Sequence, residues 1–342
     1  MNDVSKTAPD RSGAAAIWLE RVAAARAWLF LAVLIIGFEA WAELFDGVSF
    51  IANASNIRSI AVFAVAPLLL AIGQTYVIIS GGIDLSVGFT MGFASVVASQ
   101  AINLATPSLG PVLGLLAGIV ITLLASAVPG LVNGLLIARL KVPPFIGTLG
   151  MFGVARGFAY LLAGGTTVPV DNTALAWLGN GSVLGLPVVV LAAILAMLVL
   201  HYVLSQRRFG QYTYAVGGNR QAAVRAGIDV KRVTVYLYVL SAICAGIGGI
   251  LYAGRFSAGA AQAGEPLLLD SIAAVVIGGA SLFGGSGTIV GTLIGALIVA
   301  VIQYGLVFIN VEPFWQFIAV GVVIIISVLV DQSQRRGGRV DE

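Results

Sequence analysis

Residues able to carry out bond chemistry are scarce in this sequence. It contains one histidine, His201, and one cysteine, Cys244, and both belong to apolar runs. Single residues of these types cannot assemble a metal site or a His- or Cys-based catalytic centre, and no disulfide can form within the chain. We therefore expect no cofactor, no metal and no catalytic residue. The remaining candidates are charged and polar side chains in apolar surroundings.

Arg156 is the most informative of these charges. It follows Pro143 by 13 residues, which at 1.5 Å per residue places it roughly 20 Å along a helix that begins there. A charge at that depth in a membrane should face the protein interior and find a partner. Asp270 begins another apolar segment from the opposite side, so we predict a structural charge pair between Arg156 and Asp270.

Asp84 follows a glycine pair at the junction of two apolar runs. Its carboxylate can cap a helix that begins at Leu85, with help from Ser86. A second interpretation adds that Gly81 and Gly82 unwind the backbone beside a solute pathway, as discontinuous helices do in transporters. The residue types leave both interpretations open.

Amide, hydroxyl and aromatic side chains inside apolar runs could hydrogen-bond a polar solute. They are Gln74, Thr75, Tyr76, Asn133, Ser271, Gln303 and Tyr304. Each could equally make an interhelical hydrogen bond of about 0.6–2 kcal/mol. The predicted substrate pathway consists of Gln74, Tyr76, Asp84, Asn133, Ser271 and Gln303.

Composition predicts the elements that hold these residues. Apolar residues make up 59% of the 342 and charged residues only 10%, against about 25% charged residues in a soluble domain. About twenty apolar residues cross the ~30 Å of membrane hydrocarbon as a helix. Ten segments qualify: 28–45, 57–79, 85–104, 111–138, 143–163, 186–204, 233–253, 268–282, 288–309 and 314–331. We predict an all-α polytopic membrane protein of about ten segments, in which the short eighth is broken or re-entrant.

Basic residues predict the orientation. Of the 18 lysines and arginines, 15 fall within 1–26, 139–141, 205–232 and 332–342. The positive-inside rule then places both termini in the cytoplasm and requires an even number of crossings. Because these charges lie at the ends of apolar runs, they favour contact with membrane lipid and argue against a nucleic-acid partner.

The segment 205–232 is the only sizeable polar stretch between apolar runs. Asn219 is a good N-cap, and Gly227 is a natural helix stop. The predicted short helix between them carries Arg220, Ala222, Ala223 and Arg225. A small helix of this kind suits docking into a groove on a partner, although a solvated connector whose arginines only set topology explains the pattern as well.

Two glycine-rich patterns bear on nucleotide binding. GGSGTIVG at 284–291 contains spaced glycines, but a dinucleotide loop also needs a βαβ unit and a following acidic residue. Here the glycines open a membrane helix, which favours close helix packing or a broken backbone. The sequence G-x-x-x-x-G-K-[ST] does not occur, so ATP hydrolysis would have to come from a partner.

Four separated motifs stand out along the chain. They are GGIDLSVG at 81–88, FIGTLGMFGVARG at 145–157, FGQYTYAVGGNRQAAVRAGI at 209–228 and GGASLFGGSGTIVGTLIGAL at 278–297. In type and order they resemble the membrane subunits of ribose-type ABC importers, and the resemblance covers about residues 50–330. It implies a permease that works as a dimer in a bacterial inner membrane, with cytoplasmic ABC ATPase subunits and a periplasmic or extracytoplasmic sugar-binding protein. It also implies that 219–227 is the ATPase-coupling helix.

The apolar segments and the distribution of basic residues divide the chain into three predicted parts. Residues 1–26 form a cytoplasmic N-terminal segment, 27–331 the transmembrane permease domain with its coupling loop 205–232, and 332–342 a cytoplasmic tail. GGIDLSVGFTMG and GGASLFGGSGTIVG both follow an isoleucine-rich run. If segments 1–5 and 6–10 are repeats, the odd number of crossings makes them inverted.

We therefore predict a permease that moves a monosaccharide or related polyol by alternating access and does not itself hydrolyse ATP. One alternative is a secondary transporter driven by an ion gradient. Such transporters usually need intramembrane carboxylates, and only Asp84 and Asp270 are available. A membrane-embedded enzyme or scaffold is the other alternative, and no His/Cys/Glu constellation supports it. The sequence leaves open the identity of the sugar and whether the permease pairs with itself or with a sister chain.

Overall fold

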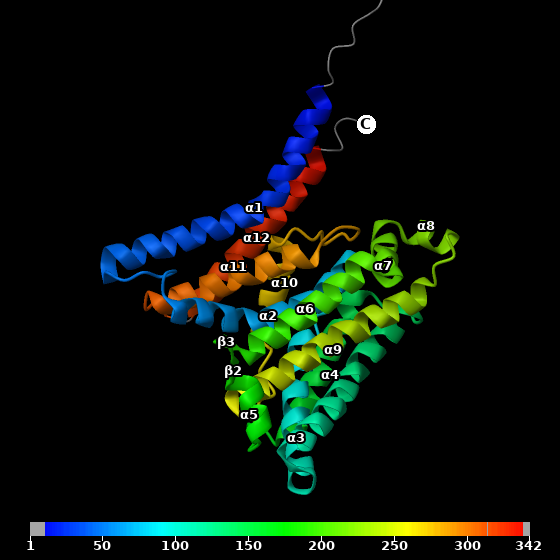
Figure 1. Ribbon diagram of the computed structural model, residues 1–342. Helices are drawn as coiled ribbons and strands as arrows, with labels where there is room; N and C mark the ends of the chain where they lie inside the picture. The colour runs from blue at the N-terminus through cyan, green and yellow to red at the C-terminus, as the bar shows by residue number, and fades with distance from the viewer. Residues whose placement is uncertain (1–10, 313, 338–342) are drawn as a thin grey trace, which may run out of the picture.

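The computed structural model describes residues 11–312 and 314–337, and most of them belong to long helices that lie side by side (Figure 1). The helices are α1 (Arg11–Trp41), followed by a π-helical turn (Ala42–Asp46), α2 (Ala54–Ile79), α3 (Val87–Ala138), α4 (Pro144–Ala163), α5 (Thr173–Asn180), α6 (Val188–Gln206), α7 (Arg208–Gly218), α8 (Arg220–Arg225), α9 (Val230–Phe256), α10 (Leu267–Ile277), α11 (Ile289–Phe308) and α12 (Phe314–Gly337). The strands are β1 (Val168–Pro169), β2 (Ser182–Val183), β3 (Leu186–Pro187) and β4 (Ala258–Gly259).

The predicted all-helical membrane fold is confirmed. In the described part of the chain, seven helices are long and apolar enough to cross a membrane. One of them, α3, has 52 residues and contains a non-helical residue, Gly110, at φ 77° and ψ 173°. The chain reverses around this residue, because a Cβ at Gly114 would lie 2.9 Å from the Cα of Thr106, and Figure 1 shows α3 folded back on itself. Predicted segments 85–104 and 111–138 are therefore the two arms of α3. With α3 counted twice, and with the short helix α10 and the apolar stretch Phe314–Val323 of α12 added, each of the ten predicted segments contains a helix.

The eighth segment is short, as its sequence predicts. Helix α10 has 11 residues, so it spans roughly 16 Å, about half of the hydrocarbon thickness. Non-helical chain then leads to Thr288, which caps α11 by accepting a hydrogen bond from the backbone of Gly291. This interruption resembles the one between α2 and α3, where residues 80–86 are non-helical.

Helix α2 lies at the centre of the molecule, in contact with α6, α9, α10 and α11. From Leu68 to Ile79 every residue is buried. Close approach requires small residues, since a Cβ at Gly73 would lie 2.8 Å from the Cα of Ser241 on α9. The same holds where α9 packs on α3, at Gly130 and Gly249. Small residues at helix contacts are typical of membrane proteins, where van der Waals packing drives association.

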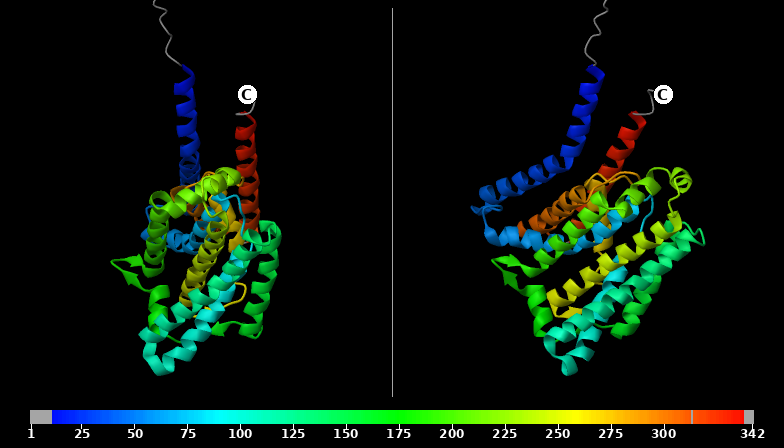
Figure 2. Two further views of the ribbon diagram at one scale, coloured as in Figure 1. Left: turned by 90° about the vertical axis from the view of Figure 1, so that its right-hand side faces the viewer. Right: turned by 45° about the vertical axis from the view of Figure 1, so that its right-hand side comes forward.

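The described ends of α1 and α12 lie toward the same end of the molecule as α7 and α8, as the two views of Figure 2 show. The Gly110 turn and α5 lie at the opposite end, where β1 pairs with β4 and joins the end of α4 to the end of α9. This arrangement agrees with the even number of crossings expected from the charges. The two interrupted connections follow the second and eighth segments, which do not occupy equivalent positions in halves of five segments each. The similarity of the two glycine-rich motifs therefore does not by itself support the predicted inverted repeat.

Candidate functional site

Asp84 lies in the interruption between α2 and α3 and is 1% exposed. Its Oδ1 accepts hydrogen bonds from the backbone N–H of Ser86 (3.0 Å) and from the Ser86 hydroxyl (2.6 Å), and its Oδ2 accepts one from Ser241 on α9 (2.9 Å). The predicted helix start at Leu85 is wrong, because α3 begins at Val87. Asp84 closes the turn before the helix and ties that turn to α9.

Further polar side chains hold the same turn from three directions. Gln74 on α2 donates to the carbonyl of Asp84 (2.5 Å), and Asn133 on the second arm of α3 donates to the Ser86 hydroxyl (3.0 Å). Tyr238 on α9 donates to the carbonyl of Ile83 (3.2 Å). We call the set the buried polar cluster: Gln74, Asp84, Ser86, Asn133, Tyr238 and Ser241.

Sequence reasoning selected Gln74, Asp84 and Asn133, and the structure brings these three together. It did not select Tyr238 and Ser241, which lie in the apolar run 233–253. The signal was present, since both are hydroxyl side chains inside a membrane segment and Ser241 follows Tyr238 by three residues on one helix face.

The other predicted pathway residues lie apart from this cluster. Tyr76 donates to the carbonyl of Leu200 on α6 (2.6 Å) and stacks on Phe209. Ser271 donates to a carbonyl of its own helix, and Gln303 on α11 donates to Asp270 on α10 (2.7 Å). Two further candidates, Thr75 and Tyr304, bond to Thr292 and Asn56. Each of these five side chains therefore has a hydrogen-bond partner within the chain.

The structure does not contain the predicted ion pair between Arg156 and Asp270. The Arg156 guanidinium lies 5.2 Å from the ring centroid of Phe89 and 5.9 Å from that of Tyr160. Asp270 takes its hydrogen bond from Gln303 instead. The helices explain the difference, because α4 packs against α3 whereas α10 packs against α2, α11 and α12. A salt bridge that the structure does show, Arg232–Asp229, involves neither of these residues.

Helix α4 leaves one face uncovered. Arg156 is exposed on it, together with Gly150, Gly153 and Gly157, and a Cβ added to any of these glycines would meet no atom within 4 Å. A guanidinium on a membrane helix is costly against lipid. This face therefore needs a protein or aqueous neighbour, and we call it the α4 glycine face.

Helix α8 has the form that its sequence predicts. Asn219 accepts a hydrogen bond from the backbone of Ala222 (2.9 Å), and Gly227 has φ +80° beyond the helix end. Of the predicted coupling residues, Ala223 is 3% exposed and packs into the core of the same chain, so it anchors α8 and does not face a partner. The exposed residues are Asn219, Arg220, Gln221, Ala222, Val224, Arg225, Ala226 and Gly227. Sequence reasoning missed Val224, an apolar side chain that is 58% exposed.

Helix α7 precedes α8 in the chain and contacts both interrupted connections, α2–α3 and α10–α11. A Cβ on Gly217 would lie 1.7 Å from the carbonyl oxygen of Ile79, at the end of α2. Gly285, before α11, donates its N–H to the same Ile79 carbonyl (2.8 Å). Tyr214 on α7 donates to the carbonyl of Gly287 (2.7 Å), and burial raises the pKa of Tyr214, so that its hydroxyl remains a donor. We call residues 79–82, 214–217 and 284–287 the glycine junction.

The described residues contain no group of three or more His, Cys, Asp or Glu side chains that could hold a metal ion. The arrangement consists instead of membrane helices, with interrupted connections between α2 and α3 and between α10 and α11, and of α7, which packs against those interruptions and leads into the exposed helix α8. Many membrane spans with interrupted helices among them are typical of multi-pass transport proteins, the class to which membrane permeases belong.

Comparison with known proteins identifies the family. Residues 56–328 match the family of permease components described as branched-chain amino acid transport system / permease component, and the chain belongs to this family. The ribose import permease protein RbsC of Bacillus subtilis is 40% identical over 78% of this chain and 81% of its own length. The fructose import permease protein FrcC of Rhizobium meliloti is 35% identical, over 90% and 85% respectively. The galactofuranose transporter permease protein YtfT of Escherichia coli is 40% identical, over 78% and 76%.

Proposed function

We propose that this chain is the sugar-conducting permease subunit of an ABC importer in a bacterial inner membrane, with both termini in the cytoplasm. The sugar relatives support a monosaccharide or related polyol as the substrate. The family description names branched-chain amino acids, which makes them the substrate class to test against. The observation that carries the proposal is α8, an exposed helix whose supporting helix α7 touches both interrupted connections.

The ATPase partner docks on α8. Arg220 and Arg225 offer guanidinium donors to acidic or carbonyl groups of a partner, and Val224 between them offers an apolar contact. Asn219 and Ala223 hold the helix at a fixed angle, one through its cap and the other through burial. A pre-formed helix loses little conformational entropy on docking, so even a small contact surface gives useful affinity.

A movement of α8 would be transmitted to the membrane helices α2 and α11 through the contacts of the glycine junction. Because Gly217 touches the end of α2 without room for a side chain, α7 cannot shift without displacing Ile79 or opening the contact. The displaced segment continues directly into the turn that the buried polar cluster holds. ATP-driven closure of the partner would thus act on the α2–α3 and α10–α11 connections together, which alternating access requires of a permease.

The solute passes along the α4 glycine face, between this chain and a second permease copy. The buried polar cluster lies inside the chain and is tied together by hydrogen bonds, whereas the α4 glycine face is open, contains three exposed glycines and carries Arg156. Glycines allow close approach of a second helix or of a solute, and a guanidinium can donate to sugar hydroxyls.

Transport by reconstituted vesicles tests the proposal. The chain is reconstituted with a candidate ABC ATPase and a candidate binding protein from the same genome, and uptake of ribose, fructose, galactose and leucine is measured with and without ATP. We expect ATP-dependent uptake of a sugar. Leucine uptake alone would overturn the substrate class, and sugar uptake driven by an ion gradient without the ATPase would overturn the importer.

A further inference from the structure

The chain between α9 and α10 is not helical. Residues 257–266 include β4, which pairs with β1 at the Gly110 end of the molecule, and continue as turns until α10 begins at Leu267. The backbone N–H of Ala260 donates a hydrogen bond to the Ser95 hydroxyl on the first arm of α3 (3.0 Å). We call residues 257–266 the turn segment, and α3 holds it in place along this arm.

Contacts with α3 and α4 give the depth of the turn segment. A Cβ at Gly88 on α3 would lie 2.6 Å from the carbonyl oxygen of Gly264. The next residue, Phe89, packs edge-to-face on Phe152 of α4, with the ring centroids 4.6 Å apart. Phe152 follows Pro144 by eight residues in a helix of 20, so it lies roughly 12 Å along α4. The end of the turn segment is therefore level with the middle part of a membrane span.

Two polar side chains of the turn segment are exposed at this depth, Gln262 and Glu265. Within the described part of the chain, neither side chain has a hydrogen-bond or ion-pair partner. Non-helical backbone at membrane depth is tolerated only where it is buried in protein or lines a water-filled cavity, and a carboxylate is costly against hydrocarbon. The exposed side of the turn segment therefore needs an aqueous or protein neighbour.

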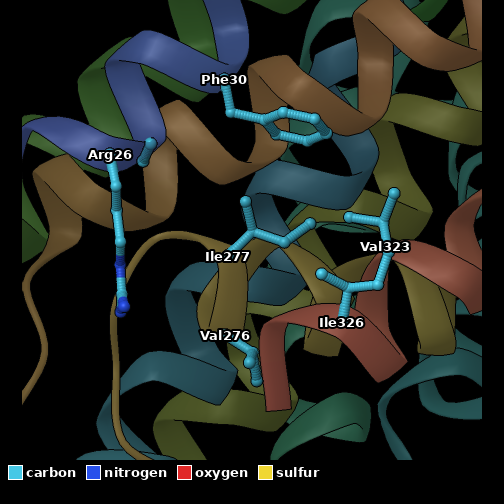
Figure 3. A pocket seen from close by; sticks show the side chains of 7 residues that line it. Arg26, Phe30, Val276, Ile277, Val323 and Ile326 are labelled. Carbon is cyan, nitrogen blue, oxygen red and sulfur yellow. The ribbon is translucent and has the colours of Figure 1, made fainter. Parts of the chain in front are cut away.

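A groove between α1, α10 and α12 has the opposite character. Phe30, Ile277, Val323 and Ile326 are grouped around it, and Arg26 extends away to one side of them (Figure 3). Apolar side chains offer a polyol no hydrogen-bond partners. Of these two surfaces, the turn segment is the one suited to a sugar.

We propose that Gln262 and Glu265 line the solute pathway and bind hydroxyl groups of the passing sugar. A carboxylate accepts hydrogen bonds from hydroxyls, and an amide both donates and accepts them. Arg156 is level with these groups, because its guanidinium lies 5.2 Å from the centroid of the Phe89 ring, and it supplies donors. Acceptors and donors on neighbouring faces of α3 suit a neutral ligand rich in hydroxyls. The inference rests on the proposed function, since the ligand is the transported sugar.

Thiol labelling tests whether the turn segment faces water, without a sugar or a transport partner. Gln262→Cys and Glu265→Cys are made in the full chain, whose native Cys244 is buried, and vesicles containing each variant are treated with a positively charged methanethiosulfonate. Because the reactive thiolate and the charged reagent both require water, we expect labelling roughly tenfold faster than in Leu195→Cys on the exposed side of α6. Rates no faster than in Leu195→Cys would overturn the proposal.

Sugar uptake tests the contact with the solute. Glu265→Gln keeps the size of the side chain and removes its charge, so maximal uptake should fall about tenfold, the effect of losing a charge-assisted hydrogen bond. The ratio of uptake among ribose, fructose and galactose should also change, whereas a merely structural defect would slow all three alike. Glu265→Asp retains the charge and should recover part of the uptake.

Glu43→Gln is the matched control, because Glu43 is an exposed glutamate in the π-helical turn after α1. Uptake by this variant should equal that of the wild type. Unchanged uptake in Glu265→Gln, or an equal loss in Glu43→Gln, would overturn the role of Glu265 and leave the proposed function standing. If the wild-type chain transports no sugar, the proposed function fails, and with it the sugar as the ligand of Glu265, while the labelling still reports whether the turn segment lies in water.

Discussion

Replacing Gly217 by alanine should uncouple ATP hydrolysis from transport. The new Cβ would lie 1.7 Å from the carbonyl oxygen of Ile79 and 2.7 Å from the backbone nitrogen of Gly285. Since non-bonded heavy atoms approach to about 3.5 Å, α7 must move away from α2 by nearly 2 Å. Overpacking of this kind costs about 1–3 kcal/mol, which a folded helical core can tolerate.

The displacement would open the contact that joins α8 to both interrupted connections. We expect the complex to assemble and to hydrolyse ATP at its basal rate, while sugar uptake falls at least tenfold and stimulation by the loaded binding protein disappears. ATPase activity and uptake are measured on the same proteoliposomes. Thermal unfolding of the purified chain reports whether the fold persists.

Gly218→Ala is the matched control. It adds the same methyl group to the next residue of the same helix, where nothing lies within 4 Å of the new Cβ. We expect uptake close to wild type. If Gly217→Ala transports normally, or if Gly218→Ala fails to the same degree, the glycine junction does not carry the coupling.

Three further changes test the other parts of the site. Tyr214→Phe removes the hydrogen bond to Gly287 without adding bulk, and uptake should fall severalfold while assembly persists; an unchanged rate would argue against this contact. Asp84→Ala removes the acceptor for Ser86 and Ser241, and the free energy of unfolding in detergent should fall by about 2–4 kcal/mol, a loss that calorimetry should detect. Because the native Cys244 is buried, Gly153→Cys introduces one reactive thiol on the α4 glycine face. Oxidation of this variant should yield a disulfide-linked dimer. Leu195→Cys, on the exposed side of α6, is the control and should remain monomeric.

The sequence predicted the membrane segments well because length and apolarity alone determine whether a helix can cross a bilayer. It also predicted the cap and stop of α8, since Asn219 and Gly227 act through their own neighbouring backbone. These are local properties. They depend on residues within one turn or one segment of the chain.

The pairing of Arg156 with Asp270 failed for the opposite reason. Depth along two helices was compatible, but depth does not specify which helices are neighbours or which way their faces turn. In the fold, α4 lies against α3, and Arg156 lies near aromatic rings. Asp270 meets an amide on α11. For the same reason the sequence did not show which of the predicted pathway residues are neighbours. In the structure, Gln74, Asp84 and Asn133 belong to the buried polar cluster, and the others make their hydrogen bonds elsewhere.

The sequence alone determined that this chain crosses a membrane many times, has a short eighth helix and carries a small exposed helix between two apolar runs. Only the tertiary structure decided what the glycine-rich motifs do. Three of the four, 81–88, 209–228 and 278–297, meet at the glycine junction, and the fourth, 145–157, supplies the α4 glycine face. The physical reason is that glycine has no side chain, so its role depends on what packs against its backbone, and that neighbour comes from a distant part of the chain.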